Sequence, residues 1–95
     1  MRKPVLTGEN AETLGLRCLA FLAAEPDRFG RFLALTGIGP TEIRDQAKDP
    51  SFLGAVLDYL LSDEDLLLSF CAAEKIDPLV PAAARSRLPG APVYD

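Results

Sequence analysis

Apolar residues recur every three or four positions along most of this sequence, which is the spacing of one face of an α-helix. In the clearest example, between Pro50 and Leu61, six apolar residues share one broad face: Phe52, Leu53, Val56, Leu57, Leu60 and Leu61. No stretch alternates apolar and polar residues for long, as a half-buried strand would. The pattern predicts an all-α fold, a compact bundle of five or six short helices.

An acidic residue or a glycine followed by proline divides the chain at four places: Glu25-Pro26, Gly39-Pro40, Asp49-Pro50 and Asp77-Pro78. The fixed φ of proline suits the first turn of a helix, where its missing N–H would have no partner. An aspartate just before it can cap the free amides. Because proline also keeps the preceding residue out of the helical conformation, each pair is expected to end one helix and begin another.

Apolar spacing and these boundaries together predict helices over residues 9–24, 26–36, 40–48, 50–61, 62–74 and 77–88. Gly37 is expected to end the second helix in the left-handed conformation. Ser62 and Asp65 have the spacing of a capping box and are expected to open the fifth. Pro81 lacks a donor that the sixth helix would need. That helix is therefore expected to start near Val80 or to begin with a 3₁₀ turn.

The 95 residues fit a single domain. We expect an N-terminal arm over residues 1–8, a helical domain over 9–88, and a frayed tail over 89–95. Short turns predict that consecutive helices pack against each other. The first helix is apolar on two sides and should be central; Leu16, Leu19 and Ala23 form its second stripe. Phe21 and Leu57 are expected among the most buried residues.

Charge and cysteine content narrow the classes of function. The formal charge is −4, and the pI is about 4.7, which argues against broad binding to nucleic acid or to an anionic membrane. The charge is divided unevenly, with +1 over residues 1–48 and −5 over 49–95. No segment has the ~20 apolar residues of a membrane span. Cys18 and Cys71 lie in apolar helical patterns and are expected to be buried free thiols. We expect a cytoplasmic protein.

The segment over residues 35–47 resembles the helix-hairpin-helix motif, in which a turn between two helices holds a DNA phosphate with backbone amides. Gly37, Ile38 and Gly39 form the turn, and Arg44 and Lys48 are the nearby basic residues. Glycines allow the backbone to approach an anion, and a helix N-terminus attracts it. Pro40 removes one amide donor, however, and a capped short helix explains the same residues. Nucleic-acid binding is therefore the second hypothesis.

Two further groups of charged residues are candidates for a site. Arg28 and Arg31 lie about one turn apart and could grip a phosphate or a carboxylate of a partner. Glu25 and Asp27 are close enough to neutralise them locally, and a solvated helix face is the simpler explanation. Three consecutive acids, Asp63-Glu64-Asp65, diverge around a helix start and stabilise its positive end. We therefore expect no metal site there.

Catalytic chemistry has little support in the sequence. The chain contains no histidine, which is the commonest general base. Its serines lie in no G-x-S-x-G or S-x-x-K motif. We predict no catalytic residues and no cofactor. Acids distant in the sequence can still meet in space, so an uncharacterised enzyme stays as a third hypothesis.

The predicted fifth helix is apolar nearly all round, because Leu66, Leu67, Leu68 and Phe70 point in different directions. Gly15, Gly30 and Gly54 lie within helices, where glycine costs ~1 kcal/mol relative to alanine. Close approach between helices is one reason to accept that cost. Surplus apolar surface suits burial in a partner. The first hypothesis is therefore a non-catalytic protein-interaction module, which binds either a second copy of itself or another protein.

The chain also resembles a family of bacterial, largely alphaproteobacterial, proteins of about a hundred residues that are described only as a domain of unknown function. The resemblance lies in residues 20–26, 31–37, 43–44, 52–58 and 66–71, and it covers most of residues 11–88. These are mainly core and turn positions. The resemblance implies a compact all-helical fold and no established activity.

Overall fold

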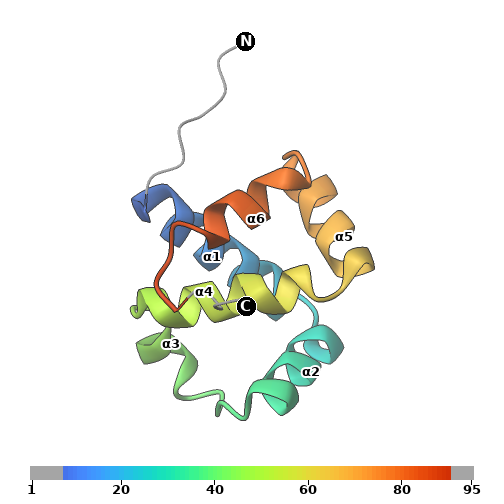
Figure 1. The fold of residues 1–95 in the computed structure, drawn as a ribbon. Helices are drawn as coiled ribbons and strands as arrows, with labels where there is room; N and C mark the ends of the chain where they lie inside the picture. Colours follow the sequence, from blue (N-terminus) through green and yellow to red (C-terminus); the bar gives the residue numbers. More distant parts are fainter. Residues whose placement is uncertain (1–7, 91–95) are drawn as a thin grey trace.

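Over residues 8–90, the computed structural model contains six helices (Figure 1). They are α1 (Gly8–Ala23), α2 (Pro26–Thr36), α3 (Ile43–Gln46), α4 (Pro50–Leu61), α5 (Glu64–Glu74) and α6 (Leu79–Arg85). The structure describes residues 8–90, and within that range there is no strand. The predicted all-α fold is confirmed. Residues 1–7 of the predicted arm and residues 91–95 of the predicted tail lie outside the described residues.

Aspartate caps begin three of the helices. Asp49 accepts a hydrogen bond from the backbone N–H of Ser51 at 2.9 Å, and Pro50 occupies the first turn of α4. Before α6, Asp77 accepts from the N–H of Leu79 at 2.8 Å. These two acid-proline boundaries are confirmed. Glu25 makes no side-chain cap at the start of α2, although Pro26 opens that helix as predicted.

The capping box predicted for α5 is wrong by one residue. The hydroxyl of Ser62 donates to the carbonyl oxygen of Tyr59 at 2.6 Å, so Ser62 completes the end of α4. Asp63 takes the N-cap position of α5 and accepts from the N–H of Leu66 at 3.2 Å. Asp65 follows in the first turn.

The third helix is shorter than predicted and does not begin at Pro40. The N–H of Glu42 donates to the carbonyl oxygen of Gly39, which closes a tight turn over residues 39–42. Only the four residues Ile43–Gln46 form α3. Ile43 and Ala47 pack against the core, as their spacing predicts.

The structure combines the two alternatives for the sixth helix: α6 begins at Leu79, next to the predicted Val80, and a 3₁₀-like turn leads into it. The N–H of Val80 donates to the carbonyl oxygen of Asp77, three residues earlier. Pro81 therefore lies within the first turn of α6, where its missing N–H is tolerated. The helix ends at Arg85. After it, the chain forms turns as far as Leu88, closed by backbone hydrogen bonds between residues three positions apart.

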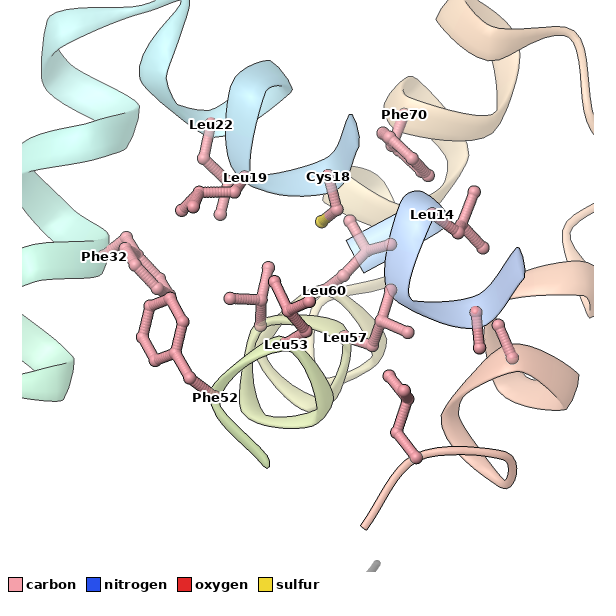
Figure 2. Close-up of a cluster of buried hydrophobic side chains, with 14 of the residues drawn as sticks. Leu14, Cys18, Leu19, Leu22, Phe32, Phe52, Leu53, Leu57, Leu60 and Phe70 are labelled. Carbon is pink, nitrogen blue, oxygen red and sulfur yellow. The ribbon is translucent and has the colours of Figure 1, made fainter. Parts of the chain in front are cut away.

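The core is centred on the contact between α1 and α4, the most extensive between any two helices (Figure 2). Leu53, Leu57 and Leu60 of α4 point toward Cys18 and Leu22 of α1, and all five are at most 2% exposed. Because α1 also packs against α2 and α6, its predicted central place is confirmed. Consecutive helices pack against each other as predicted in two cases, α1 with α2 and α4 with α5, but the most extensive contact joins two helices that are separated by two others.

Of the two residues expected among the most buried, the structure confirms one and not the other. Leu57 is fully buried, as predicted. Phe21 is only half-buried, and one face of its ring is covered by a charged group, the guanidinium of Arg28, 4.1 Å from the ring centroid. The second apolar stripe of α1 is also mostly wrong: Leu19 is buried, whereas Leu16 is 44% exposed and Ala23 is exposed.

A buried arginine, Arg85, fixes the last turn of α6 to α4. Its Nε donates to a carboxylate oxygen of Asp58 at 2.7 Å, and its Nη atoms donate to the carbonyl oxygens of Leu88, Pro89 and Gly90. Gly54 lies one turn before Asp58 and makes room for the guanidinium. A Cβ at Gly54 would lie 2.7 Å from an Nη of Arg85 and 3.1 Å from the Pro89 carbonyl oxygen. Pro89 and Gly90, predicted to begin the frayed tail, accept these hydrogen bonds.

Replacing Leu57 by alanine should lower the free energy of unfolding by ~2–5 kcal/mol, because the lost side chain leaves a cavity at the centre of the core. Urea unfolding followed by circular dichroism measures the change. Leu35→Ala is the matched control: Leu35 is 69% exposed, so its change should stay within ~0.5 kcal/mol. Equal effects of the two substitutions would contradict the core described above.

A second prediction compares two glycines that both lie inside helices. Gly54→Ala should destabilise the protein by ~1–3 kcal/mol, since the added methyl group displaces the Arg85 guanidinium. No atom lies within 4 Å of a Cβ added at Gly30, so Gly30→Ala should stabilise it by ~0.5–1 kcal/mol. Thermal unfolding of both variants tests the signs, and stabilisation by Gly54→Ala would show that Arg85 does not need this space.

Candidate functional site

An open pocket of about 340 Å³ lies between the first turns of α2 and α5. We call it the α2–α5 pocket. It is lined by Asp27, Arg28 and Arg31 of α2, Tyr59 of α4, and Asp63, Asp65, Leu66 and Ser69 at the start of α5. Arg28 and Arg31 are two of the seven candidate binding residues named from the sequence. The other five belong to the turn before α3 and to α3 itself or its end.

Aromatic packing holds the α2 wall of the pocket in place. Phe32 of α2 is fully buried. Its ring makes an edge contact with Tyr59 at 5.1 Å between centroids and another with Phe52 at 6.3 Å. Such contacts fix the relative orientation of rings as well as burying them. The neighbouring Arg31 is therefore carried on a helix whose rotation is set by the core.

The guanidinium of Arg28 is occupied by contacts with neighbouring residues of the chain. It pairs with the carboxylate of Glu25, donates to the carbonyl oxygen of Phe21 at 3.1 Å, and covers the ring of Phe21. These contacts join the start of α2 to the end of α1. Neutralisation of an arginine by Glu25, expected from the sequence, holds for Arg28.

Arg31 has no such role. Its side chain is exposed, and within residues 8–90 it makes no hydrogen bond or ion pair. Asp27 lies one turn earlier but does not pair with it. A guanidinium presents donors in a planar fork that suits a carboxylate, so Arg31 is the group in the pocket most available to a ligand.

The acids of the pocket have local structural explanations. Asp63 caps α5, Asp65 lies in the first turn of α5, and Asp27 lies in the first turn of α2. Negative charge stabilises the positive end of a helix at these positions. Within the described residues, no group of three or more acidic or cysteine side chains could hold a metal ion.

The hairpin-like turn is closed by local contacts. Gly37 is left-handed at φ 74°, as predicted, and its N–H donates to the carbonyl oxygen of Leu33. Ile38 is half-buried and packs against the core. The carboxylate of Glu42 lies beside Gly39, 3.0 Å from the position that a Cβ would occupy. A carboxylate beside this turn disfavours the approach of a phosphate, which the resemblance would require.

The basic residues beyond this turn are exposed. Lys48 lies 4.0 Å from a carboxylate oxygen of Asp45, and Arg44 makes no ion pair within residues 8–90. The helix that carries Arg44 is only four residues long. It therefore offers little dipole to an anion. The structure thus separates the seven candidates into a pocket pair and a turn group.

Both cysteines are buried free thiols, as predicted. Burial, together with the nearby Cys71, raises the pKa of Cys18 to about 12. Burial and the nearby Asp77 raise the pKa of Cys71 as well. Because the thiolate is the nucleophile, neither sulfur is prepared for nucleophilic catalysis at neutral pH.

The helices and the pocket define a small all-α domain. Within residues 8–90, no helix combines the length and the apolar character needed to cross a membrane. The chain belongs to the family described as protein of unknown function (DUF3572), whose model matches residues 8–91. This confirms the resemblance inferred from its core and turn residues. No curated protein and no solved structure matches the chain.

The buried thiols predict how stability changes at high pH. The folded protein keeps the Cys18 proton up to about pH 12, whereas the unfolded chain releases it near the ordinary value of 9.0. Unfolding is therefore favoured as the pH rises above 9, by up to ~1.4 kcal/mol per pH unit for this thiol. Urea unfolding under reducing conditions between pH 7 and 10.5 measures the slope.

Cys18→Ala is the control for that slope. It should be less stable than the natural chain at pH 7, because it leaves a small cavity, yet its stability should decline less steeply above pH 9. Parallel declines of the two proteins would show that Cys18 is not the group responsible.

Proposed function

We propose that this domain is a non-catalytic protein-interaction module of the cytoplasm and that it binds through the outer side of α5. Four exposed residues, Asp65, Leu68, Ser69 and Ala72, have the spacing of one helix face. We call them the α5 face. Asp65 and Ser69 also line the α2–α5 pocket, so the face and the pocket form one continuous surface.

The observation that carries the proposal is Leu68. Its neighbours in the sequence are held by the core: Phe70 is fully buried, and Leu66 and Leu67 pack against the core. Leu68 is 45% exposed on the α5 face. The surplus apolar surface expected for this helix is therefore one leucine beside a charged pocket. An apolar centre with a polar rim is the usual composition of a protein interface.

A binding role also fits the chemistry of the side chains. The chain has no histidine, and its two thiols are buried with raised pKa values. In contrast, the pocket contains an arginine whose donors are unused within the described residues. Arginine is among the residues enriched at interfaces and at their energetic centres. These features support recognition of a partner rather than turnover of a substrate.

Capture of partners from an extract of the cells that make the protein tests the proposal. Leu68→Glu should abolish capture of the specific partner, since a charge at the centre of the face must be desolvated on binding. Leu35→Glu places the same charge on another exposed leucine, at the far end of α2, and should retain the partner. Quantitative mass spectrometry compares the captured proteins. Equal capture by the two variants would refute the assignment of the α5 face.

A further inference from the structure

The acids of the α2–α5 pocket come from both of its walls. Asp27 lies on the α2 wall, and Asp63 and Asp65 lie on the α5 wall. Asp27 and Asp65 are exposed, and neither side chain makes a hydrogen bond or ion pair within the described residues. Asp63 caps α5 with one carboxylate oxygen and keeps its negative charge. Within residues 8–90, no ion pair neutralises any of these carboxylates.

The basic charge around the pocket is smaller. Arg28 is paired with Glu25, so Arg31 is the cation without an ion pair among the described residues that line the pocket. The starts of α2 and α5 add two positive helix ends, each equivalent to about half an elementary charge. Glu64 lies in the same first turn of α5, is exposed, and adds a further negative charge to those of the aspartates. The pocket and its rim are therefore net acidic.

An exposed leucine adjoins these acids. Leu68 is 45% exposed. It follows Glu64 by four positions and Asp65 by three, so both acids lie one turn before it on α5. The helix dipole explains acids at the start of a helix, but it explains neither an exposed leucine beside them nor the meeting of two acidic helix starts at one pocket. An apolar contact surrounded by charge of one sign suits a partner of complementary charge.

We infer that the partner is a basic segment of another protein. A lysine or arginine of that segment enters the pocket between Asp27 and Asp65, and a neighbouring apolar side chain covers Leu68. Opposite charges across an interface attract a partner and fix its register, whereas like charges exclude the wrong one. An acidic segment, or a second copy of this pocket, would bring carboxylates together. This inference rests on the proposed binding role of the α5 face and names the chemistry of its partner.

The lining of the pocket suits a long basic side chain. Lysine and arginine combine an apolar stem with a charged end. The half-buried Tyr59 and Leu66 offer apolar surface to the stem, and the carboxylates accept the N–H donors of the charged end. Arg31 does not oppose this arrangement, because its guanidinium can donate to a backbone carbonyl oxygen of the bound segment.

Selection of random short peptides, displayed on phage, against the full natural chain tests the chemistry of the partner. The enriched peptides should carry net positive charge, with a large apolar residue within a few positions of a lysine or arginine. A synthetic peptide of the enriched sequence should bind less tightly as the salt concentration rises, because salt screens the attraction. Enrichment of acidic or uncharged peptides overturns the inference, and so does the absence of any enriched peptide.

Charge reversal then locates the site for that peptide. Asp27→Lys and Asp65→Lys should each weaken its binding at least tenfold in a fluorescence anisotropy titration. Asp45→Lys is the matched control, because it makes the same change at an exposed acid in the first turn of α3, outside the pocket. It should leave the affinity unchanged, and circular dichroism should show equal helicity for every variant. Equal affinities of Asp65→Lys and Asp45→Lys overturn the assigned site.

A peptide with glutamate in place of its basic residue separates lost attraction from lost folding. It should bind Asp65→Lys at least tenfold more tightly than it binds the natural chain, a gain that an unfolded variant cannot produce. Absence of this gain overturns the pairing of the basic residue with Asp65. The proposed function fails separately, if Leu68→Glu captures the same proteins as Leu35→Glu.

Discussion

The close packing of α1 on α4 is the contact on which the other helices depend. A Cβ added at Gly15 would lie 2.9 Å from the Cβ of Leu53, so the absence of a side chain there lets the two helices approach closely. The two helices form a central pair. Helices α2 and α6 pack against α1, and α5 and α6 pack against α4. Each outer helix can thus be fixed by one or two large side chains instead of a core of its own.

Polar contacts of two arginines join the outer helices α2 and α6 to the central pair. Arg28 ties the start of α2 to α1, and Arg85 ties the end of α6 to α4. Arg85 is only 6% exposed, and losing its partner would leave a buried charge, which costs more than the pair gains. These two arginines make contacts that stabilise the fold. Arg31 lies on an ordered helix but makes no hydrogen bond or ion pair within the described residues.

Features that depend on neighbours in the sequence were predictable. The caps at Asp49 and Asp77 and the left-handed Gly37 follow from local chemistry, and so does the apolar face of α4. The boundary at Pro40 was wrong because a hydrogen bond within its turn competes with a longer helix. Ser62 could serve either the end of one helix or the start of the next, and the sequence does not decide between them.

Features that depend on distant segments were not predictable. Phe21 has the spacing of a core residue, but its ring is covered by Arg28 from the following helix. The role of Arg85 requires Gly54 and Asp58, about thirty positions earlier; a glycine one turn before an acid within a helix was the available signal. The sequence identified Arg28 and Arg31 as candidates. It could not bring Asp65, Tyr59 and Ser69 to them, because three helices meet at the pocket.

The distance along the chain between α1 and α4 has a consequence for biosynthesis. A nascent chain that has left the ribosome only as far as α3 exposes the apolar stripe of α1, since the surface that covers it has not yet been made. That stripe is available to chaperones during this interval. Asp58 then stays without its counter-ion until Arg85 has been synthesised. Chains that terminate before Arg85 would therefore lack the contact that joins the last turn of α6 to α4.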